Sequence, residues 1–461
     1  MTDSIETPEK QYSLATQTSY SLGSFFGDFL ITLLSLMVFK FYETEIFLPV
    51  FFVSAAIVIY GIWNMFNDPL AGYISDRNLE FLKKRGKRFT WFVITTIPSS
   101  IVFFLIFMPP LGNDIAIFLW LILTLCLLDT LTSFSSVNWQ AIFPDKFRSQ
   151  KERTKIGGIE IFLSLIGLAL GTLLPMLMTT PGSPESYVTL GIMVSITCLF
   201  AAFLMIPGMK EDRAMIERTF RVKEDSANKE SYFQELKFAL KQKNYVAYLF
   251  AYLAQTTVMT LMLASVPYWV QYIVQTDPFY EIIILLAFLL ASVASAPIWI
   301  RIARKYGNRI GYMCGTGGTA LFLIVGMFIW DFPYVIIGFI LIGISMGATW
   351  TLIYATFSDV IDEIVMKTGK RREGIYYGFR TFIGRLSIVI QAITFGIIHP
   401  LTSFDPAASL QPVEAQWGIN VGMFAVPAVF YFIGFLFMWK VYDLKPDKVL
   451  SNKEKLLELK L

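Results

Sequence analysis

The sequence has little charge, little cysteine and almost no histidine. Only 16% of its 461 residues are charged, and it holds three cysteines and one histidine. Cys126, Cys198 and Cys314 lie inside apolar stretches, so we expect neither a disulfide framework nor a metal cluster. The single His399 has no catalytic arrangement of serine, cysteine or aspartate around it. For these reasons we expect no enzyme, no cofactor and no resident metal. The net charge of only +3 gives no sign of a nucleic-acid partner.

Apolar residues dominate the chain instead. They make up 55% of the sequence, and the mean hydropathy is +0.58, which is too high for an ordinary soluble domain. A helix needs about 20 mostly apolar residues to cross a bilayer, and such stretches recur with short polar breaks. We predict an all-α membrane protein with twelve transmembrane helices at residues 20–42, 46–74, 89–110, 114–142, 157–180, 186–207, 245–274, 279–302, 309–331, 334–362, 375–400 and 417–441.

The charges alternate between successive loops. The loops after the second, fourth, eighth and tenth predicted helices are strongly basic, whereas the intervening loops are acidic or neutral. The positive-inside rule then places both termini in the cytoplasm, as an even helix count requires. Residues 1–19 lack the basic and apolar regions of a cleaved signal peptide. We expect a multi-pass protein of the cell membrane.

One long hydrophilic stretch divides the predicted helices six and six. A short repeat supports this division, because Gly86-Lys87-Arg88 after the second helix matches Gly307-Asn308-Arg309 after the eighth. Six-plus-six transporters are built from such parallel repeats, so we predict a major facilitator fold with two six-helix lobes. The predicted boundaries are a cytoplasmic tail at 1–19, a lobe at 20–209, a cytoplasmic linker at 210–243, a lobe at 244–441 and a cytoplasmic tail at 442–461.

Several carboxylates lie inside predicted transmembrane helices. A carboxylate at the bilayer centre costs about 2.5–3.5 kcal/mol, so it needs a partner, a water-filled cavity or a role. Asp28 lies mid-helix, and Asn64 and Asp68 are one turn apart on the second helix, where two oxygens could meet one cation or proton. The alternative is a set of buried ion pairs that only hold helices together.

The fourth helix carries a polar stripe that begins at Asp129 and includes Thr132 and Gln140. Glu160 lies near the cytoplasmic end of the fifth helix, and Arg385 lies deep in the eleventh. Because arginine cannot shed its charge, Arg385 needs an acidic partner. These residues are our candidates for the wall of a solute-binding cavity.

Aromatic residues are a second source of candidates. Trp139, Tyr268 and Trp350 could offer flat surfaces to a sugar ring or a lipid. The alternative is that they belong to helix packing and to the aromatic belts at the membrane interface.

Two segments resemble the glycoside-pentoside-hexuronide cation symporter family, which includes melibiose permease. One is Asn67-Asp68-Pro69-Leu70, continuing to Asp76-Arg77, and the other is SDVIDEIVMKTGKRREGIYYGFRTF at 358–382. A weaker match is VNWQAIFPDK at 137–146. The resemblance covers essentially the whole chain.

The resemblance implies roles for three residues. Asp28 would contact substrate hydroxyls, Asp68 would belong to the cation site, and Arg385 would help close the substrate site. The chain also departs from melibiose permease, because Asn64 replaces a cation-site carboxylate. The family's helix 4 carboxylate aligns nearer Thr132 than Asp129, and Glu160 stands near a sugar-contacting arginine.

From these observations we predict symport of a sugar, glycoside or related polar solute. Asn64 favours H⁺ over Na⁺ as the coupling ion, although Na⁺ at Asp68 is the other candidate. Transport of a lysolipid-like solute and a non-transporting receptor or scaffold are the alternatives. The expected partners are a small solute and membrane lipids, with the protein a monomer. The candidate gate residues, which would form ion pairs that break and reform as the lobes rock, are Asp76, Arg77, Arg88, Asp359, Asp362 and Arg372. The alternative is that these are surface ion pairs without a role in transport.

Overall fold

The computed structural model describes residues 11–458 except 76–79, 111, 148, 214, 218–231, 276–277, 330, 332–333 and 370–372. All of the regular structure within these residues is helical. Up to the charged linker the helices are α1 (Leu14–Lys40), α2 (Val50–Ser75), α3 (Lys87–Leu105), α4 (Asp114–Lys146), α5 (Gln150–Met178) and α6 (Pro184–Met209). A π-helical segment, Phe41–Glu45, extends α1, and a 3-10 turn, Glu80–Lys83, precedes α3.

The helices after the linker are α8 (Tyr232–Leu240), α9 (Lys243–Trp269), α10 (Pro278–Tyr306), α11 (Asn308–Gly326), α12 (Tyr334–Thr368), α13 (Glu373–Leu401), α14 (Val413–Asn420), α15 (Val426–Lys440) and α16 (Pro446–Glu458). π-Helical segments extend α9 (Val270–Val274) and join α14 to α15 (Val421–Ala425).

Among the described residues, eleven helices are long and apolar enough to cross a membrane. The predicted ninth span corresponds to α11, which has 19 residues but carries Gly-Thr-Gly-Gly-Thr at 315–319, so its hydropathy is lower. The prediction of an all-α membrane protein is confirmed, and the helix count agrees with the twelve predicted spans.

The chain forms two compact units. One consists of Met1–Leu48 and Phe66–Ala227, and the other of Pro49–Met65 and Asn228–Leu461. The first half of α2 thus belongs to the second unit, where Gly61 approaches Val389 of α13 closely. The lobe and linker boundaries drawn from the sequence stay predictions.

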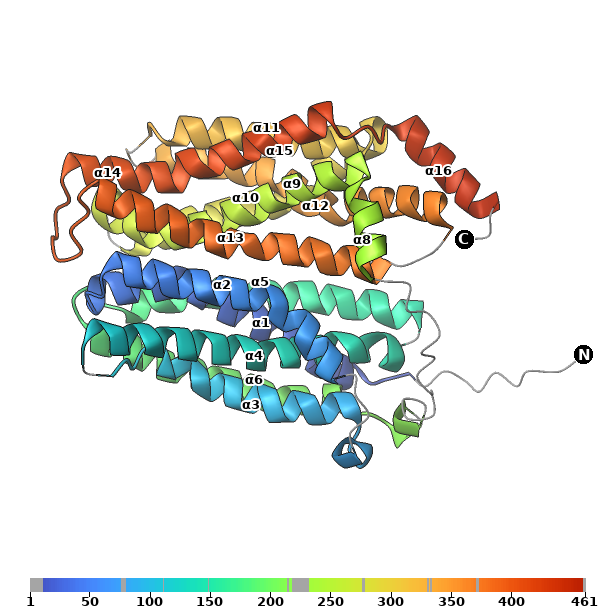
Figure 1. The fold of residues 1–461 in the computed structure, drawn as a ribbon, viewed down its shortest axis with the longest axis horizontal. Coiled ribbons are helices and arrows are strands. Elements are labelled where there is room, and N and C mark those ends of the chain that lie inside the picture. Colours follow the sequence, from blue (N-terminus) through green and yellow to red (C-terminus); the bar gives the residue numbers. More distant parts are fainter. Residues whose placement is uncertain are drawn as a thin grey trace, which may run out of the picture. The chain divides into compact units, whose positions relative to one another are not determined.

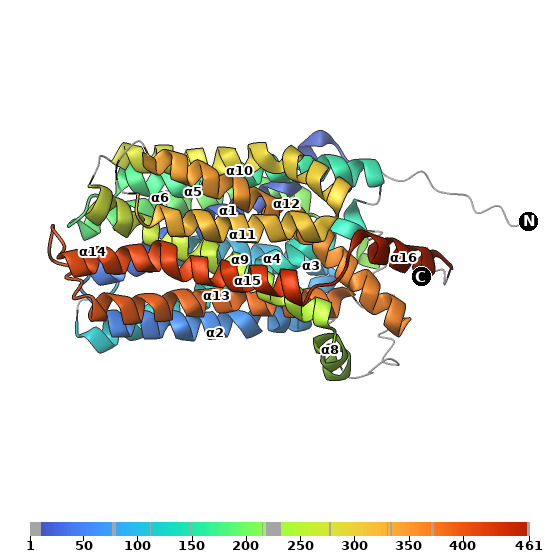
Figure 2. The same cartoon turned by 90° about the horizontal axis from the view of Figure 1, so that it is seen from above.

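The two units repeat the same helix pairing. In the first, α1 packs against α5 and α6, and α3 packs against α4 and α6. In the second, α9 packs against α13 and α15, and α11 against α12 and α15 (Figure 1, Figure 2). The matching helices α1 and α9 are each 32 residues long, including the five-residue π-helix in which each ends.

The glycine repeat seen in the sequence is also a structural repeat. Gly86 precedes α3 at φ 92° and ψ 149°, and Gly307 precedes α11 at φ 88° and ψ 158°. A positive φ favours glycine at both positions, because any other side chain would be strained there. The same turn therefore starts α3 and α11, which have matching neighbours in the two units.

A buried lysine anchors α4 to the end of α6. Lys146 is 4% exposed, and its Nζ donates hydrogen bonds to the carbonyls of Pro207, Gly208 and Lys210 at 3.3, 2.6 and 2.8 Å. The last carbonyls of a helix have no intrahelical partner and attract positive charge. Lys146 therefore fixes the helix that carries most of the candidate site.

Candidate functional site

The second half of α2 and the middle of α4 are held together by hydrogen bonds to two carboxylates, Asp68 and Asp129. The Oγ of Ser133 donates to Asp68 Oδ1 at 2.5 Å, and the Nδ2 of Asn67 donates to Asp129 Oδ2 at 2.8 Å. Adjacent residues of α2 thus meet residues that are one turn apart on α4. Asn67 is 1% exposed and Asp129 is 7% exposed, so both lie within the unit. We call these four residues the α2–α4 cluster.

One oxygen of the α2–α4 cluster lacks a hydrogen-bond donor among the described residues. The Oδ1 of Asn67 is buried and accepts no hydrogen bond from the described residues, a costly arrangement for a buried polar atom. Two carboxylates, an amide oxygen and a hydroxyl are the hard ligands that an alkali cation prefers, and a carboxylate can instead take a proton. Asn64 lies buried one turn before Asp68, while Thr132 donates its hydroxyl to Leu128 within α4.

The predicted substrate contact Asp28 lies between α1 and α5. Its carboxylate accepts a hydrogen bond from the Oγ of Ser164. Glu160 is half-buried and lies one turn before Ser164 on α5. The structure therefore brings Asp28 close to the helix that carries Glu160, and it adds Ser164, which sequence reasoning did not select.

The two other candidates on α4 have different surroundings. Trp139 stacks on Tyr20 with ring centres 5.4 Å apart, and its Nε1 donates to the Tyr20 carbonyl at 2.9 Å. The Tyr20 hydroxyl in turn donates to the Trp139 carbonyl at 3.1 Å. Gln140, the next residue, is exposed.

The aromatic candidates of the second unit lie in separate clusters. Tyr268, near the end of α9, is 1% exposed and packs against His399, with ring centres 5.2 Å apart. Trp350 on α12 meets the edge of Phe288 on α10 at 5.8 Å. Arg385 is half-buried on α13. Substrate-binding roles for these residues stay predictions.

Of the two arginines in the eleventh predicted helix, sequence reasoning selected Arg385 and not Arg380, which lies about one and a half turns before it. Arg380 is 3% exposed, although it is an arginine inside a transmembrane helix. Four aromatic rings surround its guanidinium: Tyr252, Tyr354, Phe357 and Tyr377. The presence of an arginine in the eleventh span was the available signal, but the rings come from three helices and only the structure brings them together.

The candidate gate residues are only partly described. Arg88 at the start of α3 donates from Nη1 to Asn138 Oδ1 on α4 at 3.2 Å. Asp359 on α12 is 5% exposed. It accepts a hydrogen bond at 2.7 Å from the Nδ2 of Asn308, the first residue of α11. Asp362 lies three residues further along α12 and is half-buried. The predictions for Asp76, Arg77 and Arg372 fall outside the described residues.

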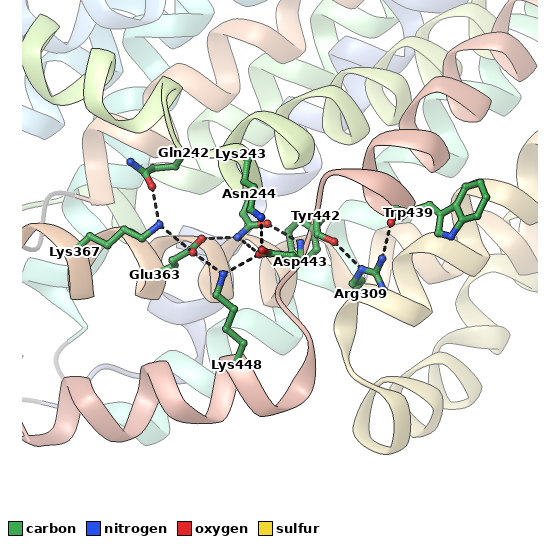
Figure 3. A network of polar contacts seen from close by, with 10 residues as sticks. All are labelled: Gln242, Lys243, Asn244, Arg309, Glu363, Lys367, Trp439, Tyr442, Asp443 and Lys448. Carbon is green, nitrogen blue, oxygen red and sulfur yellow. Dashed lines mark hydrogen bonds and ion pairs between the residues drawn. The ribbon is translucent and has the colours of Figure 1, made fainter.

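Next to Asp359, a charged network ties three helices together (Figure 3). Glu363 on α12 is 2% exposed and accepts from Asn244 on α9 at 2.7 Å. Lys448 on α16 bridges Glu363 at 3.1 Å and Asp443 at 2.8 Å. Partial burial raises the pKa of Asp443, but hydrogen bonds from Lys243, Lys448 and Asn244 outweigh it and hold this pKa well below its usual range. The sequence analysis did not predict this network.

Two repeated six-helix units with buried carboxylates between helices define a membrane transporter. The chain belongs to the MFS/sugar transport protein family, whose model matches residues 19–445. The predicted membership of the major facilitator superfamily, with a resemblance to the glycoside-pentoside-hexuronide symporters, is confirmed.

Three similar proteins illustrate the family. The sodium-dependent lysophosphatidylcholine symporter 1 of Mus musculus is 22% identical over 86% of this chain and 79% of its own length. The glucuronide carrier protein homolog of Escherichia coli is 28% identical over 38% of this chain and 39% of its own length. The crystal structure of the nucleoside transporter NupG matches with a TM-score of 0.62 and 13% identity, covering 92% of this chain and 99% of that one. All three are transporters, so the expectation that the chain is not an enzyme is confirmed.

Proposed function

We propose that the protein is a secondary active transporter that couples cation entry to symport of an organic solute by alternating access. The observation that carries the proposal is the α2–α4 cluster, where Asp68 and Asp129 lie inside transmembrane helices. Asp68 contacts Ser133, which is one turn from Asp129 on α4. Carboxylates kept at such depth mark ion or proton pathways. A receptor or scaffold would need no such group.

The coupling ion is H⁺ or Na⁺, and different observations support each. Asn64, in place of a carboxylate, favours H⁺ because it removes one negative charge from the site. The buried oxygen of Asn67 and the second carboxylate, Asp129, favour Na⁺. The sodium dependence in the name of the lysophosphatidylcholine symporter supports Na⁺ as well.

One cation per solute is energetically sufficient. A cation that moves down about 100 mV supplies about 2.3 kcal/mol, which concentrates a neutral solute about fiftyfold. A single titrating or ion-binding site in the α2–α4 cluster therefore accounts for active uptake.

For the solute we propose a sugar or glycoside, contacted by Asp28 and Ser164 between α1 and α5. A carboxylate that accepts one hydroxyl hydrogen bond has lone pairs left for the hydroxyls of a sugar. The glucuronide carrier homolog supports this class. A lysolipid is the second candidate, because the lysophosphatidylcholine symporter matches most of the chain.

We also propose a location and an orientation for the protein in the membrane. The basic loops support a protein of the cell membrane with both termini in the cytoplasm, and we propose that it is a monomer. In that orientation the contacts of Arg88 and Asp359 lie at the cytoplasmic ends of their units, where gate contacts would break and reform as the units rock.

Uptake into proteoliposomes tests the proposal. Labelled glycosides, hexuronides and lysolipids are offered with an imposed H⁺ or Na⁺ gradient to the wild type, to Asp68→Asn and to Asp129→Asn. Asp114→Asn is the matched control, because Asp114 is an exposed carboxylate at the start of α4. Gradient-driven uptake that both cluster variants abolish and the control retains supports the proposal, and the effective gradient names the ion. Uptake that is indifferent to both gradients contradicts it.

A further inference from the structure

Arg380 lies in an aromatic cage within the second unit. Its guanidinium carbon is 4.6 Å from the ring centre of Tyr252 on α9 and 4.7 Å from that of Tyr377 on α13. Phe357 and Tyr354, both on α12, complete the cage at 5.1 and 5.2 Å. A guanidinium within about 6 Å of a ring centre is attracted by the ring electrons.

Within the described residues, the positive charge of Arg380 is not paired with a carboxylate. Arg380 donates from Nη1 to the hydroxyl of Tyr248 at 3.3 Å, and its Nε is buried without an acceptor. No ion pair joins Arg380 to a carboxylate anywhere in the described part of the chain. Arginine keeps its charge at any physiological pH, and a buried charge is normally paired.

Arg380 does not cap a helix, and in this it differs from Arg309. Arg309 donates from Nε and Nη2 to the carbonyls of Tyr442 and Trp439 at 2.8 and 2.6 Å, so its role is to satisfy the end of α15. Arg380 makes no such bond to the backbone. Apart from the bond to Tyr248, its guanidinium donates to no acceptor among the described residues.

One side of the cage is accessible. Tyr354 is 64% exposed and Tyr377 is 44% exposed, whereas Arg380 between them is 3% exposed. A solute that approaches this side meets two aromatic faces first and the guanidinium behind them. Aromatic faces suit a sugar ring or an acyl chain, and a guanidinium suits a planar or tetrahedral oxyanion.

We propose that Arg380 and its cage bind an anionic group of the transported solute, a carboxylate or a phosphate. The inference rests on the proposed transport function and narrows its substrate class to negatively charged or zwitterionic solutes. A hexuronide and a lysophospholipid share this chemistry, so the same site accommodates either source of the anion. The guanidinium would form a charge-assisted, two-pronged contact with two oxygens.

Matched pairs of probes test the proposal by binding to the purified full-length chain in lipid nanodiscs. Nitrophenyl glucuronide is compared with nitrophenyl glucoside, and lysophosphatidate with monoacylglycerol, so that each pair differs only in its anionic group. We expect at least one anionic probe to bind about tenfold or more tightly than its neutral partner, the factor that one charged hydrogen bond supplies. The pair that shows the preference identifies the source of the anion.

Variants assign the preference to Arg380. Arg380→Gln should remove it, Arg380→Lys should retain part of it, and the control Arg301→Gln, at an exposed arginine of α10, should leave it unchanged. Should Arg380→Gln fail to fold, Arg380→Lys and Tyr354→Leu, at an exposed ring, take its place with a severalfold smaller preference expected. Equal binding within both pairs by the wild type overturns the proposal, as does a variant that weakens charged and neutral probes equally.

The outcome is separable from that of the transport proposal. An intact preference for the anionic probe, together with uptake that ignores both cation gradients, contradicts the coupling and leaves the anion site. Cation-driven uptake of a neutral glycoside without any preference for charge removes the anion site and leaves the symporter.

Discussion

Asn244 is the central residue of the charged network in Figure 3. It is 1% exposed, its Nδ2 donates to Glu363 and to Asp443 at 2.7 Å each, and its Oδ1 accepts from the Asp443 backbone at 2.7 Å. Asn244→Leu keeps the branched shape of the side chain and removes all three bonds. Asp443 is partly exposed and regains water, so we count only the bond to buried Glu363 in full, at about 2 kcal/mol.

The loss should appear as local opening of α16. Cleavage by trypsin at the lysines of α16 follows the population of the open state, so about 2 kcal/mol predicts cleavage about thirtyfold faster. Gln242→Leu is the control, because the Gln242 side chain accepts from the exposed Lys367 and donates to the carbonyl of Phe238 but bonds neither Glu363 nor Asp443. A rate for Asn244→Leu within twofold of the wild type, or an equal effect in the control, would refute the reasoning.

Three further predictions concern the same framework. Lys146→Met should lower the melting temperature in detergent by several degrees, because it leaves three carbonyls at the end of α6 without a donor, about 2–3 kcal/mol. Gly86→Ala should destabilise more than Gly182→Ala, because both have positive φ but only at Gly86 would a Cβ collide with Glu211; equal melting temperatures would contradict this. Asp443→Asn should lower the melting temperature at pH 7. The difference should shrink as the pH falls below about 4 and disappear only as the pH falls through the lowered pKa of Asp443, because the carboxylate stabilises the fold only while it is charged.

Hydropathy predicted the transmembrane helices but not where they end. The fifth helix was expected at 157–180, and α5 spans Gln150–Met178. Backbone hydrogen bonds carry a helix past the apolar core into polar turns, which a hydropathy average excludes. The amphipathic α16 was placed in a cytoplasmic tail because its mean hydropathy is low. The π-helical ends of α1 and α9 were not predicted, because no distinctive amino-acid composition marks a π-helix.

The candidate site was predictable as separate helix faces and not as contacts. Asp68 and Asp129 were selected because charge is rare in membrane helices, and this argument applies to each helix alone. The bond from Asn67 to Asp129 joins residues 62 positions apart, and the bond from Ser164 to Asp28 joins residues 136 apart. Such registers depend on packing between helices. For the same reason the sequence favoured Arg385, while the aromatic cage surrounds Arg380.

Comparison of exchange with accumulation in Asp68→Asn proteoliposomes tests the central claim most directly. If the α2–α4 cluster couples cation movement to solute movement, Asp68→Asn should lose gradient-driven accumulation of the labelled solute but retain exchange of labelled for unlabelled solute. Accumulation that equals that of the wild type in Asp68→Asn would contradict the account.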